Sequence, residues 1–255
     1  MSDLLVLCYH AVSDRWPADL SITPERLEDQ LRLLVERGYR SATFSEALGA
    51  APPQAKTLVV TFDDAFQSVA EHALPIMDAL GVVGTVFAVT GFVGSQEPMA
   101  WPGTDQWIGT EHEHELRALG PDGIERLVAA GWELGSHTVS HPRLTSLDDA
   151  ALEHELRRSR EDCERLVGRP CASLAYPYGD VDERVVRAAG QAGYRFAGAL
   201  SSRLRRSRPL EWPRVGIYYG DSGRRFRAKV SPAMRRLRST PAWDVADRLR
   251  WAIRR

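Results

Sequence analysis

Short apolar runs rich in β-branched and aromatic residues alternate along this chain with segments of helical periodicity. The runs are predicted strands at residues 4–9, 57–62, 84–89, 132–136, 172–176 and 195–200. This alternation is typical of a parallel sheet wrapped by helices, the α/β class. No internal repeat and no linker rich in Pro, Gly or Ser interrupts the pattern, so we expect residues 1–222 to form one catalytic domain.

The predicted helices have recognisable ends. Thr23 and Pro24 are a cap and a first helical residue, and Gly38 ends this helix. Two further helices are predicted over 148–167 and 181–192. The segment 94–120 fits neither period and is predicted to be a long insertion, a type of loop that is often a lid or a binding loop.

The composition favours a soluble globular protein. Apolar residues make up 44% and charged residues 26%, enough for a sizeable core. The first residues carry an acid where a signal peptide would be basic, so they are predicted to form a strand. Cys8, Cys163 and Cys171 contain no CxxC pair, which argues against a disulfide framework and against a thiolate zinc site. We therefore expect a cytoplasmic location.

Residues 223–255 are predicted to be a basic, helical C-terminal extension. Residues 224–255 contain eleven Lys and Arg against two Asp, although the whole chain has a formal net charge of −1. Such charge could contact a lipid-linked glycan, the pyrophosphate of a nucleotide sugar or a membrane surface, and a merely solvated tail is the alternative. Nucleic acid is not expected, because no reading helix or aromatic stacking platform is recognisable.

Two adjacent carboxylates, Asp63 and Asp64, follow the predicted strand 57–62. The carboxyl ends of parallel strands are where α/β proteins assemble their sites. Neighbouring residues at a strand end point in different directions, so one carboxylate can bind a metal while the other reaches the water beside it. The alternative is a pair of solvated acids or a helix N-cap.

Two histidines four residues apart, His137 and His141, follow the strand 132–136. On a single helical turn both imidazoles would meet one divalent ion, and a carboxylate would complete a facial triad. This donor set suits zinc, with nickel, cobalt or iron as alternatives. A packed histidine beside a surface histidine is the other interpretation.

A third motif, Tyr176-Pro177-Tyr178-Gly179, follows the strand 172–176. A tight turn of this kind can leave backbone N–H groups pointing into a site, as an oxyanion requires, although an ordinary turn has the same sequence signature.

The motifs TFDD, HTVSHP and YPYG, in this order, resemble the polysaccharide deacetylase family of NodB-type carbohydrate esterases over about residues 4–217. The resemblance implies a distorted (β/α) barrel of about seven parallel strands and metal-dependent removal of N-acetyl groups. It also implies that Asp63 is the general base, that the Tyr178 amide helps to bind the oxyanion, and that the metal ligands are Asp64, His137 and His141.

Departures from the common family pattern point to one subgroup of the family. Ala175 stands where many members have an arginine, and no Leu-x-His motif follows Trp212. Cys8-Tyr9-His10 resembles instead the circularly permuted subgroup that is similar to poly-N-acetylglucosamine deacetylases, which makes His10 the expected general acid. A buried structural histidine is the alternative. We hypothesise that Arg214 supplies the missing guanidinium that holds Asp63.

The expected substrate is therefore an N-acetylated sugar or glycan, free or linked to a nucleotide or lipid. A hydrolase of another non-peptide amide bond and a non-catalytic sugar-binding homologue are the alternatives. In the insertion, Trp101 and Trp107 could stack on sugars or pack beneath a lid. His112 and His114, each flanked by Glu, are interpreted as part of a solvated loop and not as a metal cluster.

Overall fold

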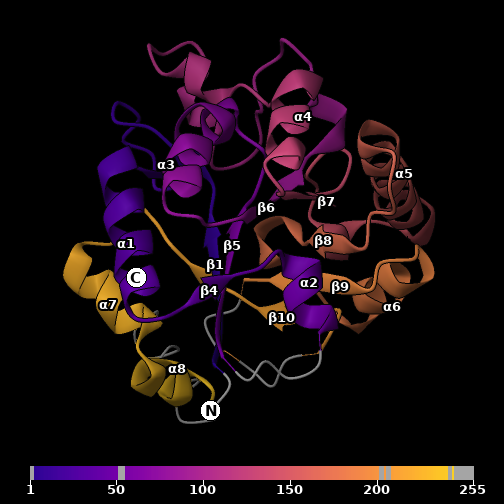
Figure 1. Cartoon of the computed structure of the whole chain (residues 1–255). Helices are drawn as coiled ribbons and strands as arrows, with labels where there is room; N and C mark the ends of the chain where they lie inside the picture. Colours follow the sequence, from indigo (N-terminus) through magenta and orange to yellow (C-terminus); the bar gives the residue numbers. More distant parts are fainter. Residues whose placement is uncertain (1–2, 51–54, 201–203, 205–207, 241–242, 244–255) are drawn as a thin grey trace.

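The computed structural model describes residues 3–50, 55–200, 204, 208–240 and 243. A large sheet lies in the middle of the molecule and helices surround it (Figure 1). Its strand order is β10-β9-β8-β7-β6-β5-β1-β11, with β4 beside β5 and every pairing parallel. The strands are β1 Asp3–Tyr9, β4 Arg40–Ser41, β5 Lys56–Phe62, β6 Gly84–Ala88, β7 Glu133–Ser136, β8 Ser173–Ala175, β9 Phe196–Ala199, β10 Trp212–Pro213 and β11 Val215–Gly216. A separate pair contains β2 Ala11–Val12 and β3 Ser21–Ile22.

One short segment joins the two edges of the large sheet. β10 pairs with β9 and β11 pairs with β1, and only Arg214 separates these two short strands. Counted as one position, the segment completes seven positions around a nearly closed barrel in the described residues. The predicted distorted barrel of about seven parallel strands is confirmed, and Arg214 lies at its seam.

The helices begin and end largely where the sequence predicts. They are α1 Pro24–Glu36, α2 Phe44–Gly49, α3 Leu74–Ala79, α4 Pro121–Ala129, α5 Asp149–Val167, α6 Glu183–Gln191, α7 Gly223–Val230 and α8 Pro232–Arg238. Thr23 caps α1 through its side chain, which accepts a hydrogen bond from the Arg26 amide. Asp148 caps α5 in the same way, and Gly168 ends α5 in the left-handed conformation with φ 66°.

Alternation along the strands separates two buried layers. In β1, Leu5 and Leu7 belong to the main core beneath the helices, whereas Val6 belongs to a smaller cluster with Val59 and Phe87. Because successive side chains of a strand point to opposite faces, Cys8 lies on the same face of the sheet as Val6. Its register partner on β5 is Thr61, which lies on the same face as Val59. At the carboxyl ends of the strands, this face of the sheet carries polar residues.

The first part of the basic C-terminal segment packs on the domain. Phe226 and Val230 of α7 are buried in the main core, and Arg235 of α8 pairs with Asp3 at 2.7 Å. The boundary at residue 222 stays a prediction. The predicted helical stretch 243–253 lies outside the described residues, apart from Trp243. Among the described helices, none combines the length and apolar character needed to cross a membrane.

Candidate metal centre and active site

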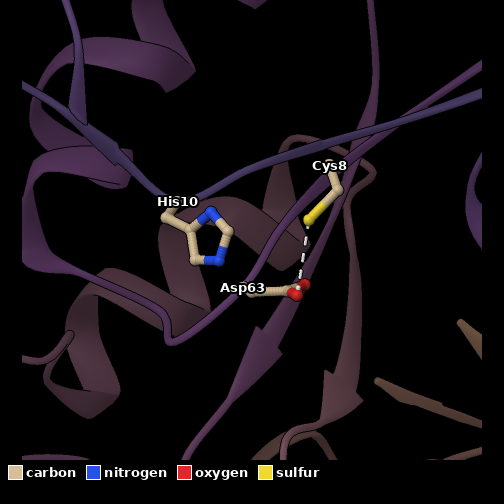
Figure 2. A group of neighbouring side chains, drawn as sticks. All are labelled: Cys8, His10 and Asp63. Carbon is tan, nitrogen blue, oxygen red and sulfur yellow. Dashed lines mark hydrogen bonds between the residues drawn. The ribbon is translucent and has the colours of Figure 1, made fainter. Parts of the chain in front are cut away.

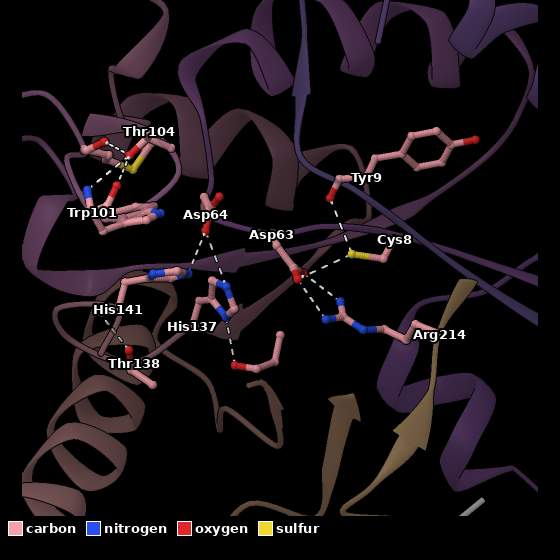
Figure 3. Close-up of polar contacts among 12 residues, drawn as sticks. Cys8, Tyr9, Asp63, Asp64, Trp101, Thr104, His137, Thr138, His141 and Arg214 are labelled. Atoms are coloured by element: carbon pink, nitrogen blue, oxygen red, sulfur yellow. Dashed lines mark hydrogen bonds and ion pairs between the residues drawn. The ribbon is translucent and has the colours of Figure 1, made fainter. Parts of the chain in front are cut away.

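The two aspartates that follow β5 point in different directions (Figure 3). Asp63 continues the strand direction, and its amide donates to the Tyr9 carbonyl at 2.9 Å. Asp64 then adopts a left-handed backbone with φ 69°, which turns its carboxylate toward the histidines. Both side chains are buried, with 1% and 2% exposed surface. Solvated acids are therefore excluded, and the two carboxylates can have separate tasks.

The histidines come together on an irregular loop after β7. We expected a helical turn, and that expectation was wrong, because Thr138 and His141 have φ of 69° and 60°. The loop is held instead by Glu155 of α5, which accepts hydrogen bonds from the Val139 and Ser140 amides at 2.8 and 3.0 Å. Side-chain hydrogen bonding thus replaces helical geometry in bringing the two imidazoles to one place.

Three potential metal-ligand atoms converge at this place: Asp64 Oδ1, His137 Nε2 and His141 Nε2. This oxygen is 3.3 Å from His137 Nε2 and 3.4 Å from His141 Nε2. It is nevertheless buried without a hydrogen bond. His137 Nδ1 contacts the Ala175 carbonyl at 2.8 Å, and because a carbonyl only accepts, this nitrogen carries the proton and Nε2 is left free as a ligand. Orphaned, converging donors of this kind fit a divalent cation.

Burial and the neighbouring charges shift the pKa values of all three groups. Burial lowers the pKa of His141 to about 3, so its imidazole is neutral and can coordinate. Burial opposes ionisation of Asp64, but the neighbouring histidines outweigh this effect and its pKa is lowered. Burial opposes protonation of His137, but the charges of Asp63 and Asp64 outweigh this effect and its pKa is raised. Within the described residues, one carboxylate and two imidazoles form a buried set whose donor atoms lie within 4.8 Å of one another. An O, N, N set of this kind suits zinc and other first-row metals.

Asp63 forms a buried bidentate ion pair with Arg214 (Figure 3). The Nη1–Oδ1 and Nη2–Oδ2 distances are 2.6 and 2.7 Å, and Arg214 also donates to Thr61 Oγ1 at 3.0 Å. Burial raises the pKa of Asp63, but the guanidinium charge and hydrogen bonds lower it by more, so the carboxylate stays ionised. A glycine at 198 makes room, because a Cβ there would lie 2.6 Å from Arg214 Nε.

Cys8 of β1 and His10, which directly follows β1, lie beside the same carboxylate (Figure 2). The Cys8 thiol donates to Asp63 Oδ2 at 3.4 Å, and burial raises its pKa well above the usual value, so it remains a thiol. His10 is 7% exposed, and burial is the main cause of its lowered pKa. The alternation of β1 could have identified Cys8 as a neighbour of His10, but the sequence offered no reason to connect it with Asp63.

A cavity of about 760 Å³ opens over these groups. Its walls include residues from each motif and from the insertion: His10, Asp63, Asp64, His137, His141, Tyr178, Trp101 and Trp107. Tyr178 lies in the short turn Pro177–Gly179 with φ 58°, and its ring centroid is 4.6 Å from that of His141. The three sequence motifs and the N-terminal His10 thus share one cavity.

The insertion 94–120 forms one wall of this cavity. Trp101 is buried and stacks on the His141 ring at 4.1 Å between centroids. Trp107 packs edge-on against Trp16 at 6.0 Å. His112 and His114 belong to neither of the two candidate ligand groups found among the described residues. Sequence periodicity could not reveal the Trp101 contact, because the insertion has no regular period.

Comparisons with known proteins point to one family. The family model described as "Polysaccharide deacetylase" matches residues 50–197, which include the motifs TFDD, HTVSHP and YPYG but not Cys8-Tyr9-His10 or Arg214. The chain is 21% identical over 209 residues to the poly-β-1,6-N-acetyl-D-glucosamine N-deacetylase of Staphylococcus aureus. That match covers 76% of this chain and 66% of the relative, and a Bacillus subtilis relative is covered over 63%, so the chain spans less than two thirds of both.

Solved structures show the same fold. A polysaccharide deacetylase from Bacillus cereus, BC0361, aligns with a TM-score of 0.73 and 25% identity, covering 89% of this chain and 69% of that one. IcaB from Ammonifex degensii aligns with a TM-score of 0.69 and 25% identity, covering 89% and 96%. With a family model over more than half of its residues, the chain belongs to the polysaccharide deacetylase family.

Proposed function

We propose that this protein is a metal-dependent N-deacetylase of an N-acetylhexosamine, free or within a glycan or glycan precursor. The observation that carries the proposal is the pairing of two buried groups in one cavity: the converging Asp64, His137 and His141, and the ionised Asp63 beside them. A protein that only binds sugar needs no ionised carboxylate next to a cation site, so this pairing favours hydrolysis.

The ligands of the ion would be Asp64 Oδ1, His137 Nε2 and His141 Nε2, and we propose zinc. A divalent ion bound there would polarise the acetyl carbonyl and lower the pKa of the attacking water, whose value is ~7 on zinc against 15.7 in bulk. Trp101, stacked on His141, keeps that imidazole in place and excludes water from one side.

Asp63 is the proposed general base, and Oδ1 is the oxygen that would take the proton from the attacking water. Oδ2 accepts from Arg214 Nη2 and from the Cys8 thiol, whereas Oδ1 accepts from Arg214 Nη1 only among these neighbours. Since each carboxylate oxygen has two lone pairs, Oδ1 retains one for the attacking water. Arg214 aims this oxygen and keeps it ionised, although the same contact weakens it as a base.

His10 is the proposed general acid. A ring nitrogen of His10 and an oxygen of Asp63 lie within 4.8 Å, so a proton taken up by Asp63 has a short path to the imidazole. From there it can pass to the leaving amine nitrogen. Because burial lowers the pKa of His10, its protonated form is a stronger acid than an ordinary imidazolium and gives up its proton more readily. The Tyr178 amide is proposed to donate to the oxyanion.

The proposal is tested by acetate release from a panel of N-acetylhexosamines, compared with allantoin and formamide as other non-peptide amides. Asp63→Asn should retain its metal and lose at least ~10² in rate, the usual scale of a general base. Asp29→Asn, on the exposed face of α1, is the matched control and should retain full activity. Activity of Asp63→Asn equal to that of the wild type would reject the role of Asp63.

A cytoplasmic location and contact of the basic C-terminal segment with a membrane remain proposals.

A further inference from the structure

One cationic side chain lines the active-site cavity and is not used by the proposed chemistry. Arg143 follows His141 and Pro142 directly and is the only Lys or Arg among the described residues that form the cavity wall. Its main chain is fixed, because its carbonyl accepts hydrogen bonds from the Ser146 amide at 3.0 Å and hydroxyl at 2.7 Å. The position of its charge is therefore set by the same loop that presents the metal ligands.

The guanidinium stacks on Tyr178. Its central carbon lies 4.3 Å from the Tyr178 ring centroid, and that ring in turn contacts His141 edge-on at 4.6 Å between centroids. The charge is thus one aromatic ring away from the site where the acetamide would react. Stacking leaves the guanidinium edge, which carries the N–H donors, free to bind a ligand in its plane.

Arg143 is exposed to solvent at the cavity wall. Other arginines of the chain, such as Arg214 and Arg235, contact a carboxylate at 2.6 and 2.7 Å. In the part of the chain that the structure describes, no ion pair within 4.0 Å involves Arg143. Besides Asp63 and Asp64, the carboxylate in the cavity wall is Asp19, which makes no such pair either. An unpaired cation in a substrate cavity can bind an anionic group of the substrate.

The structure of a 2-acetamido sugar indicates which anionic group would lie near Arg143. In a 2-acetamido sugar the anomeric oxygen is attached to the carbon next to the one that bears the amide. A phosphate on that oxygen would lie close to the acetamide, and a guanidinium binds phosphate through paired N–H donors. We propose that Arg143, stacked on Tyr178, binds a phosphate on the anomeric oxygen of the substrate. This inference rests on the proposed deacetylase function and names its substrate class.

Acetate release from matched substrates tests this proposal. The zinc-loaded protein is assayed with methyl N-acetylglucosaminide, N-acetylglucosamine 1-phosphate, the corresponding uridine diphosphate sugar and a prenyl-diphosphate-linked sugar. We expect kcat/KM at least tenfold higher for one or more of the phosphorylated substrates than for the neutral one. Which of them is best distinguishes a free sugar phosphate, a nucleotide sugar and a lipid-linked precursor.

Variants separate the role of Arg143 from general effects. Arg143→Gln should lower kcat/KM about tenfold more for the preferred phosphorylated substrate than for the neutral one, and Arg143→Lys should restore part of the loss. Arg187→Gln, an exposed arginine on α6 away from this cavity, is the matched control. Equal rates of the wild type on neutral and phosphorylated substrates, or an equal loss on both in Arg143→Gln, would overturn the proposal.

A binding measurement keeps this inference distinct from the proposed function. Titration calorimetry with N-acetylglucosamine 1-phosphate on zinc-loaded Asp63→Asn needs no turnover. We expect binding that weakens about tenfold when Arg143→Gln is added. If no substrate releases acetate but this dependence is present, the deacetylase proposal fails and the anion site stands. If the phosphate binds equally well without Arg143, through the metal alone, the anion site is refuted.

Discussion

Glu155 supports the metal ligands from outside the site, and its removal should weaken metal binding. Glu155 is 9% exposed, and its carboxylate accepts hydrogen bonds from the Val139 and Ser140 amides at 2.8 and 3.0 Å and from the Ser140 hydroxyl at 2.6 Å. They hold the loop between His137 and His141 together with backbone bonds in which the Thr138 and Val139 carbonyls accept from the Thr90 and Gly91 amides at 3.0 and 2.9 Å. The perturbation is Glu155→Ala, with Glu155→Gln as the conservative variant.

The magnitude follows from the lost contacts. A hydrogen bond to a charged group contributes about 1.5–3 kcal/mol, and the lower value applies to this half-buried loop. Losing the two amide bonds then costs about 3 kcal/mol, or about a hundredfold, the upper end of the 10–100-fold range for residues that orient metal ligands. Glutamine can still accept both amide bonds on its oxygen and donate to Ser140, so Glu155→Gln should lose less than about tenfold.

Zinc affinity is measured by competition with a chromophoric chelator, with thermal unfolding of the metal-free proteins alongside. Glu153→Ala, on the same helix but with a side chain that is 67% exposed, is the matched control. Glu155→Ala should bind zinc 10–100-fold more weakly. A Glu155→Ala variant with wild-type zinc affinity would show that the loop holds its shape without the carboxylate, and the reasoning would be refuted.

Three other variants test the groups around the reacting atoms. Arg214→Ala leaves Asp63 buried without its partner and should lower the free energy of unfolding by 3–5 kcal/mol in urea titrations, so unchanged stability would contradict the buried pair. Gly198→Ala places a Cβ 2.6 Å from Arg214 Nε and should cost about 1–3 kcal/mol and slow acetate release, and a variant with the wild-type rate would show that the guanidinium needs no such space. Trp101→Ala removes the ring on His141 and should lower stability by about 3 kcal/mol, seen as a lower Tm, whereas an unchanged Tm would argue against tight packing of this wall.

Strand positions were predictable because buried parallel strands leave unmistakable apolar runs. β5, for example, is observed at Lys56–Phe62 where 57–62 was predicted, and Asp63 and Asp64 follow it at the barrel end. The absence of an arginine at Ala175 directed attention to Arg214, which the structure places on Asp63 although 151 residues separate them. This contact was predicted from the missing arginine at position 175 and not from local periodicity.

Other contacts had no signal in the sequence. The loop between His137 and His141 was expected to be helical, but its shape depends on positive φ angles and on Glu155, whose distance along the chain conceals the contact. Trp101 reaches His141 through an insertion without a period, so its place could not be inferred. Both contacts arise from packing between segments, which single-sequence patterns do not encode.

The most direct test of the central claim is acetate release from an N-acetylhexosamine by chelator-treated protein during titration with zinc. If Asp64, His137 and His141 together hold one catalytic ion, activity should rise from the background and reach a plateau near one equivalent of zinc per chain, and His137→Ala should show no such rise. Full activity of the metal-free protein, or an identical titration curve for His137→Ala, would contradict the claim.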